Sequence, residues 1–164
     1  MQENTVALQA LRQAMRLEQD GYRFYTEAAE RTADPRGKEI FLSLADDEKL
    51  HLRIVRDQYE ALSSGKGWTA FSEVLELKPV DVDKPLFPPD KKVIDPEASD
   101  TDALLFALQI ENESYELYRK AAAETDDLAG KDMYQRLASY ERVHFDILML
   151  NYEHLVNTGT WHGL

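Results

Sequence analysis

Hydrophobic residues recur at alternating intervals of four and three positions in four long segments of the sequence. The first stripe comprises Leu11, Met15, Glu18, Tyr22, Tyr25 and Ala29, and the second Phe41, Leu44, Glu48, His51, Val55, Tyr59 and Leu62. The third comprises Leu104, Leu108, Glu111, Tyr115, Tyr118 and Ala122, and the fourth Tyr134, Leu137, Glu141, His144, Leu148, Tyr152 and Leu155. This spacing is typical of helices that turn one face toward the partners in a bundle. The pattern predicts an all-α protein with four long helices.

The second half of the chain repeats the first at an offset of 93 positions. Residues 18–62 align without a gap on 111–155, and 17 of these 45 positions are identical. The identical pairs include Glu18/Glu111, Tyr25/Tyr118, Gly37/Gly130, Glu48/Glu141 and His51/His144. Two copies are too few for a solenoid, so the repeat predicts a duplicated helical hairpin.

Capping residues place a turn in the middle of each hairpin. Asp34 and Pro35 supply a helix cap and a first-turn proline, and residues 125–127 offer similar chemistry in the second copy. Residues at one height of an antiparallel hairpin are symmetric about its turn, and the midpoint of 18 and 48 is 33, while that of 111 and 141 is 126. Glu18 should therefore face Glu48 and His51, and Glu111 should face Glu141 and His144, halfway along the helices of each hairpin.

A long connector joins the predicted hairpins. We expect one domain over 1–164, with hairpin one at about 5–64, a crossover at about 65–99, hairpin two at about 100–158 and a tail at 159–164. Five of the six prolines lie in the crossover, where 68–77 is compatible with a short amphipathic helix and 78–99 with extended chain. Its length predicts that the second and third long helices run parallel. Ser99 or Asp100 should cap the third long helix, and Gly159 should end the last, with Trp161 folding back onto the bundle.

Composition excludes several classes of partner. The chain has 31 acidic and 19 basic residues, and a formal charge of -12 repels nucleic acid and anionic membranes. It shows neither an export signal nor a spanning segment, so we expect a cytoplasmic protein. With no cysteine present, any metal must bind to carboxylates and imidazoles.

Glu18, Glu111 and the two Glu-x-x-His pairs interrupt otherwise apolar faces. Residues i and i+3 share a helix face, so Glu48 with His51 and Glu141 with His144 each direct an oxygen and a nitrogen to one point. Four buried carboxylates repel one another, whereas two divalent cations would neutralise them. The donor set suits two iron ions, with manganese or zinc as substitutes.

From Glu18 to His144 the chain resembles the rubrerythrin-like branch of the ferritin-like di-iron carboxylate superfamily. The resemblance implies a ferritin-like bundle in which Glu48 and Glu141 bridge two metals. It implies that Glu18 with His51 completes one ion, and Glu111 with His144 the other. Tyr25 and Tyr118 resemble tyrosines that hydrogen-bond to such centres or relay electrons near them.

The sequence departs from rubrerythrins proper at two points. Ser114 stands where they have a further glutamate, which makes the ligand set more like the symmetric one of bacterioferritins. The cysteine-rich rubredoxin module is also missing from this sequence, so an external electron-donor protein is expected. Asp47 is suitably placed to orient a histidine, but its counterpart is Tyr140, and neither is included in the predicted site. His154 is off the stripe and is expected to be exposed.

Three functions remain open from these residues. The resemblance implies a di-iron oxidoreductase that reduces hydrogen peroxide or dioxygen in a peroxidase or oxidative-stress role, and we expect a homodimer. The alternative is a ferroxidase or iron-binding protein for storage or delivery. A third interpretation is a helical interaction module with a vestigial site. Under any of these functions, Tyr25 and Tyr118 are also compatible with a merely structural role.

Overall fold

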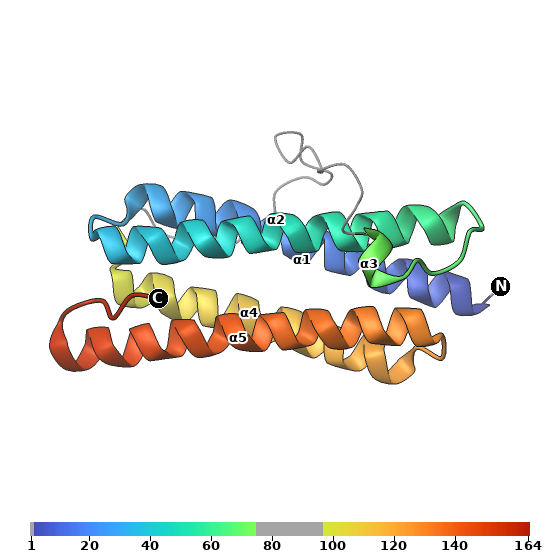
Figure 1. Ribbon diagram of the computed structural model, residues 1–164. Helices are drawn as coiled ribbons and strands as arrows, with labels where there is room; N and C mark the ends of the chain where they lie inside the picture. The colour runs from blue at the N-terminus through green and yellow to red at the C-terminus, as the bar shows by residue number, and fades with distance from the viewer. Residues whose placement is uncertain (1, 75–96) are drawn as a thin grey trace.

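In the computed structural model, which describes residues 2–74 and 97–164, four long helices form a bundle (Figure 1). The long helices are α1 (Gln2–Arg31), α2 (Pro35–Ser63), α4 (Asp100–Glu124) and α5 (Leu128–Thr158). A single turn, α3 (Phe71–Val74), follows α2. The predicted all-α bundle of two hairpins is confirmed. Within the described ranges, no helix is long and apolar enough to cross a membrane.

The connection between the hairpins is a crossover. Each hairpin consists of two antiparallel helices, and α2 and α4 run in the same direction along the bundle (Figure 1). Helix α1 packs against α4, while α2 and α5 approach each other less closely. Of the short helix predicted at 68–77, residues 71–74 form α3, residues 68–70 are not helical, which corrects the predicted start, and 75–77 lie outside the described residues. Of the stretch predicted as extended, 78–99, residues 78–96 also lie outside the described residues.

The capping residues act where the sequence predicts them. Asp34 and Asp127 accept hydrogen bonds from backbone N–H groups at the starts of α2 and α5. Ser99, rather than Asp100, caps α4 and forms a reciprocal capping box with Asp102. Gly159 ends α5 with a φ of 75°, a left-handed conformation that glycine adopts without a side-chain penalty.

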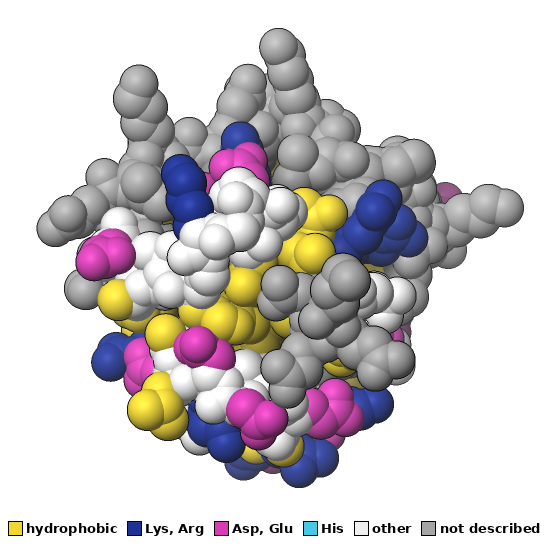
Figure 2. Space-filling model, turned by 90° about the vertical axis from the view of Figure 1, so that its right-hand side faces the viewer, with side chains coloured by type: hydrophobic (Ala, Val, Ile, Leu, Met, Phe, Trp, Pro, Cys, Tyr) yellow, Lys and Arg dark blue, Asp and Glu magenta, His cyan; other side chains and the backbone are white. Residues whose placement is uncertain are grey.

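The buried apolar residues form two clusters, one toward each end of the bundle. One contains Leu11, Leu52, Tyr118 and Leu137, and the other Phe24, Tyr25, Phe41 and Leu104, each with further side chains. Seen end-on, hydrophobic side chains are visible between charged ones (Figure 2). The buried acids and histidines of the sequence lie between the two clusters.

A tryptophan after each hairpin packs against the turn of the other hairpin. A Cβ atom added at Gly37 would lie 2.5 Å from the ring of Trp161, and one added at Gly130 would lie 2.7 Å from the ring of Trp68. Trp161 is 1% exposed and donates from Nε1 to Asp100 Oδ2 at 3.0 Å. The predicted return of Trp161 onto the bundle is confirmed. The two tryptophans hold the hairpins together reciprocally.

A buried amide side chain anchors the segment around each tryptophan. Gln58 donates to the carbonyl of Thr69 at 2.6 Å and accepts from its N–H at 2.9 Å. Asn151 accepts from the N–H groups of His162 and Gly163 at 3.0 and 2.9 Å. Gln58 and Asn151 are themselves 93 positions apart, as are Trp68 and Trp161. The repeat therefore extends beyond the long helices into the segments that follow them.

Candidate metal centre

Six acidic and imidazole side chains meet in the middle of the bundle. Each of them is at most 4% exposed: Glu18, Glu48, His51, Glu111, Glu141 and His144. Their ligand atoms form two overlapping groups, and the atoms of each group lie within 4.8 Å of one another. The first group is Glu18, Glu48, His51 and Glu141, and the second is Glu48, Glu111, Glu141 and His144. The structure therefore brings together all six residues that the sequence predicts as metal ligands.

Both imidazoles direct Nδ1 toward the carboxylates. His51 Nδ1 lies 3.0 Å from Glu141 Oε1 and 3.5 Å from Glu18 Oε2. His144 Nδ1 lies 3.4 Å from Glu48 Oε1 and 3.5 Å from oxygens of both Glu111 and Glu141. Each imidazole therefore approaches carboxylates from both hairpins. Glu48 and Glu141 are the two members that the groups share, as the bridging position implied by the resemblance requires.

Several potential metal-ligand atoms of these side chains lack a hydrogen-bond partner. Within the described residues these atoms are Oε2 of Glu18, Oε1 of Glu48, Oε2 of Glu111, Oε2 of Glu141 and Nδ1 of His144. Leaving a buried polar atom unpaired costs about 1–3 kcal/mol, and more when the group is charged. Unpaired oxygens and an imidazole nitrogen that converge on one point fit divalent cations, which would satisfy them together.

Without a cation, protons and histidine charges balance the carboxylates. Burial and then repulsion from Glu141 raise the pKa of both Glu48 and Glu111 well above the ordinary value. Burial raises the pKa of Glu141 as well, but hydrogen bonding with Glu111 and the charge of His51 hold it well below that value. Burial lowers the pKa of His51, yet the charges of Glu18 and Glu141 raise it to about 10. Metal binding must therefore displace protons.

Two tyrosines link the hairpins by hydrogen bonds, each from one hairpin to a glutamate of the other. The hydroxyl of Tyr25 donates to Glu111 Oε1 at 2.5 Å, and that of Tyr118 donates to Glu18 Oε1. Burial and the charges of these carboxylates raise the pKa of both tyrosines well above the ordinary value. Both hydroxyls therefore keep their protons and donate hydrogen bonds to the glutamates of the centre.

Asp47 and Tyr140, which sequence reasoning leaves out, contact the two histidines in different ways. Asp47 Oδ2 lies 2.9 Å from His144 Nε2, on the side of the ring away from the carboxylates. Tyr140 stacks on His51, with ring centroids 5.6 Å apart and an interplanar angle of 18°. The signal for Asp47 was present in the sequence, since it directly precedes Glu48, but its partner on the other hairpin was not visible there.

Ser114 is buried, and its hydroxyl lacks a hydrogen-bond partner among the described residues. Its counterpart at the offset of 93 is Gly21, where an added Cβ would lie 3.0 Å from Glu48 Oε2. The absence of a side chain at Gly21 leaves room for the Glu48 carboxylate. Position 114 therefore holds a small hydroxyl where rubrerythrins proper are expected to have a carboxylate.

The remaining histidine and tyrosine candidates stand apart from the six residues. His154 is only partly exposed, which corrects the expectation of an exposed side chain, because its Nδ1 lies 2.8 Å from the carbonyl oxygen of Thr160. The hydroxyls of Tyr22, Tyr59, Tyr115 and Tyr152 make no hydrogen bond within the described residues, and their rings pack at the margins of the core.

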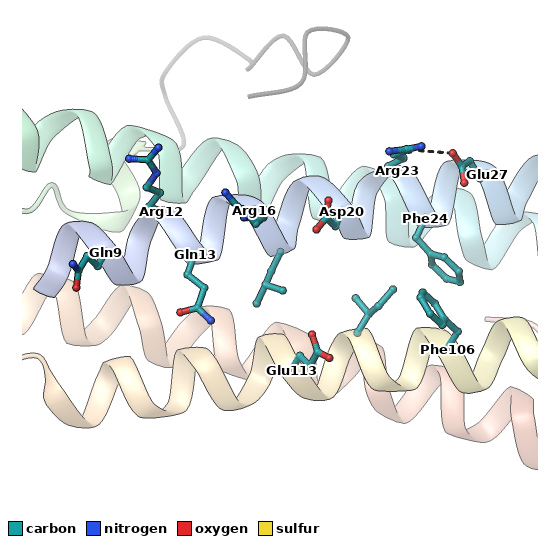
Figure 3. A pocket seen from close by; sticks show the side chains of 12 residues that line it. Gln9, Arg12, Gln13, Arg16, Asp20, Arg23, Phe24, Glu27, Phe106 and Glu113 are labelled. Carbon is teal, nitrogen blue, oxygen red and sulfur yellow. Dashed lines mark hydrogen bonds and ion pairs between the residues drawn. The ribbon is translucent and has the colours of Figure 1, made fainter. Parts of the chain in front are cut away.

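A separate groove of about 430 Å³ lies between α1 and α4 (Figure 3). Phe24 and Phe106 face each other across it, and Arg23 pairs with Glu27 at its rim. The six residues of the centre are not among those that line the groove. The groove is therefore distinct from the buried centre.

Comparison with known proteins supports this assignment of the fold and centre. A family model described as Rubrerythrin matches residues 9–152. A hypothetical protein from Pyrococcus furiosus has a similar solved structure, with a TM-score of 0.69 and 27% sequence identity over 92% of this chain and 90% of the other. No curated protein matches the chain.

Proposed function

The chain belongs to the rubrerythrin family, and we propose that it is a non-haem di-iron oxidoreductase that reduces hydrogen peroxide or dioxygen. The observation that carries the proposal is the set of unpaired buried donor atoms on Glu18, Glu48, Glu111, Glu141 and His144. The residues that carry these atoms belong to two overlapping groups of ligands, which suit two cations at neighbouring positions. Mixed oxygen and nitrogen ligands fit iron, with manganese and zinc as substitutes.

In this proposal the six side chains divide between the two ions as the family resemblance implies. Glu18 with His51 would hold one ion, Glu111 with His144 would hold the other, and Glu48 and Glu141 would bridge them. These residues would hold two Fe²⁺ ions, which would supply the two electrons that, with two protons, reduce hydrogen peroxide to two molecules of water. Two further electrons must then come from a separate donor protein for the cycle to repeat.

The polypeptide contributes proton placement and exclusion of water. The protonated hydroxyls of Tyr25 and Tyr118 donate hydrogen bonds to Glu111 and Glu18, directly beside the centre. We propose that they steady these carboxylates and relay electrons or protons during turnover. The six proposed ligands are nearly inaccessible to solvent, and apolar clusters lie on both sides of them. This environment strengthens each charge interaction at the centre.

Iron oxidation for storage or delivery is the second candidate, and Ser114 favours it. A rubrerythrin that shifts an iron between ligands would use the additional glutamate at this position, whereas this chain offers the symmetric set of six. In that case dioxygen or hydrogen peroxide would accept electrons from Fe²⁺ bound at the centre, and the resulting Fe³⁺ would leave for storage or delivery. For either activity we propose a cytoplasmic homodimer that acts without nucleic acid or membrane.

Anaerobic titration with Fe²⁺ followed by oxidant tests the proposed function. We expect two Fe²⁺ per chain, oxidation by substoichiometric peroxide or dioxygen, and rapid repeated turnover once a reductant is supplied. Oxo-bridged ferric absorption would report each oxidation. Accumulation of ferric iron beyond two per chain would favour storage instead. Failure to bind Fe²⁺ tightly would contradict both activities and favour a vestigial site.

A further inference from the structure

The two halves of the centre differ in the group behind each histidine. Positions 47 and 140 are equivalent in the repeat, but one holds an aspartate and the other a tyrosine. Asp47, on α2, reaches across to Nε2 of His144 on α5. Tyr140, on α5, reaches across to His51 on α2, but it offers a ring face rather than an acceptor. An otherwise symmetric site therefore has unequal supports.

Asp47 fixes the orientation of His144. A hydrogen bond from Nε2–H to the carboxylate directs Nδ1 toward Glu48, Glu111 and Glu141, where it can bind a cation that displaces its proton. This Nδ1 is also one of the buried atoms without a hydrogen-bond partner. The His144 side of the centre is therefore already arranged to coordinate a cation.

His51 has no such anchor. No hydrogen bond to its Nε2 exists among the described residues, and its ring stacks with those of Tyr140 and His144, with centroids 5.6 Å from each. Phe71 of α3 contacts Tyr140 in turn, with centroids 6.5 Å apart. Aromatic packing restrains the plane of the His51 ring, but it supplies no hydrogen-bond acceptor for Nε2–H.

We propose that Asp47 is a positioning residue for His144 and that it makes the His144 half of the centre the tighter of two unequal metal subsites. This inference rests on the proposed dimetal function and deepens it. Partners of this kind behind a metal-bound histidine are worth about 10- to 100-fold in metal affinity. One subsite has such a partner and the other does not, so the two ions should bind in separable steps.

Calorimetric titration of the metal-free chain with Zn²⁺ tests the inference. We expect two Zn²⁺ per chain in two steps, and we expect Asp47→Ala to weaken the tighter step about 10- to 100-fold while leaving the other step unchanged. Asp47→Asn should recover much of the loss, because its amide oxygen still accepts the Nε2–H bond. Asp46→Ala, which removes the neighbouring exposed carboxylate on the same helix, should leave both steps unchanged.

Comparison of Asp47→Asn with Asp47→Ala separates the effect of orienting His144 from the effect of the aspartate charge. If Asp47 only attracted cations, Asp47→Asn would weaken binding as much as Asp47→Ala, and that result would overturn the inference. Nitrogen-15 spectra of the Zn²⁺-loaded protein give a second readout, since Asp47→Ala should speed solvent exchange of His144 Nε2–H and leave His51 unaffected. Unchanged exchange would also overturn it. Two equal Zn²⁺ sites in the wild-type chain would refute the asymmetry alone, whereas no Zn²⁺ binding would refute the dimetal centre as well.

Discussion

Glu141 contributes to both groups of ligand atoms, so its loss should affect both cations. We expect Glu141→Ala to abolish the pairing of the metals, with Fe²⁺ uptake falling from two per chain to one or none. Anaerobic Fe²⁺ titration and the ferric absorption after oxidation measure this change. Glu153→Ala, which removes an exposed glutamate farther along the same helix, is the matched control. Unchanged stoichiometry and an unchanged spectrum would contradict a bridging role for Glu141.

The hydroxyl of Tyr118 is bonded to a buried carboxylate, so its removal should be felt in the metal-free fold. Hydrogen bonds to charged groups contribute about 1.5–3 kcal/mol, and Tyr118→Phe should lower the free energy of unfolding by about that amount. Urea unfolding of chelator-treated protein measures the loss. Tyr152→Phe is the control, because that hydroxyl makes no hydrogen bond within the described residues. Equal stability of the two variants would show that the bond to Glu18 contributes nothing.

The residues of the centre could be predicted from the sequence, but their contacts across the two hairpins could not. Helical spacing and the repeat identified all six buried acids and histidines, because periodicity determines which side chains share a face. Spacing within one helix does not show which side chain on another helix will be met. For that reason the sequence placed Tyr25 beside the centre without indicating that it bonds to Glu111 of the other hairpin. The tyrosine at the equivalent position 140 argued against including Asp47, and only the structure shows that its carboxylate meets His144 on α5.

The contact between Trp161 and the start of α2 requires a glycine at position 37. Alanine normally favours a helix over glycine by about 1 kcal/mol, but its Cβ here would lie 2.5 Å from the tryptophan ring. We expect overpacking to dominate, so that Gly37→Ala lowers the free energy of unfolding by about 1–3 kcal/mol. Denaturant unfolding measures the effect, and Lys38→Ala, at the exposed neighbouring position, is the control.

A double substitution identifies the origin of that cost. Trp161→Ala alone should be destabilising by about 3–5 kcal/mol, because the ring is buried. In the Trp161→Ala background, Gly37→Ala should lose most of its penalty, since the collision with the ring is gone and only the contact of the added Cβ with Thr32 Cγ2, at 2.7 Å, remains. A penalty as large in the double variant as in the single one would show that Trp161 is not the main cause.

The helices and their ends were predictable because the capping residues act on their immediate neighbours. The segments after α2 and α5 were less so. Trp68 and Trp161 are at the same offset of 93 as the helices, but only the structure shows that each ring packs against the glycine of the opposite hairpin. The helix expected at 68–77 starts later than predicted, at Phe71, because Trp68 packs on Gly130 and Thr69 is hydrogen-bonded to Gln58 before the helix begins.

The whole bundle is held together by contacts that pass from one hairpin to the other. The tyrosine bonds join α1 to α4, the tryptophans join each hairpin to the turn of its partner, and each group of ligand atoms draws on both hairpins. Cations at the centre would therefore add a further link between the two hairpins. Metal binding and stability of the bundle should be coupled.

This coupling should depend on pH, because protons replace cations in the metal-free protein. The pKa of His51 rises from 6.5 to about 10 on folding, and those of Glu48 and Glu111 also rise. A group whose pKa is higher in the folded state contributes stability that is complete below its unfolded pKa and is lost as the pH rises through the folded value. For His51 that loss spans about pH 6.5 to 10. The lowered pKa of Glu141 acts in the opposite sense, but only at acidic pH.

We therefore expect the melting temperature of chelator-treated protein to fall between pH 6.5 and 9, by an amount that corresponds to a few kcal/mol, since one pKa unit is worth about 1.4 kcal/mol. In Zn²⁺-loaded protein the cations take over the role of these protons, so the melting temperature should change much less. Thermal unfolding of both forms across this range measures the difference, and the loaded form controls for surface titration because it shares every exposed group. A gap between the two forms that stayed constant with pH would show that the buried histidine and glutamates do not exchange protons for metal.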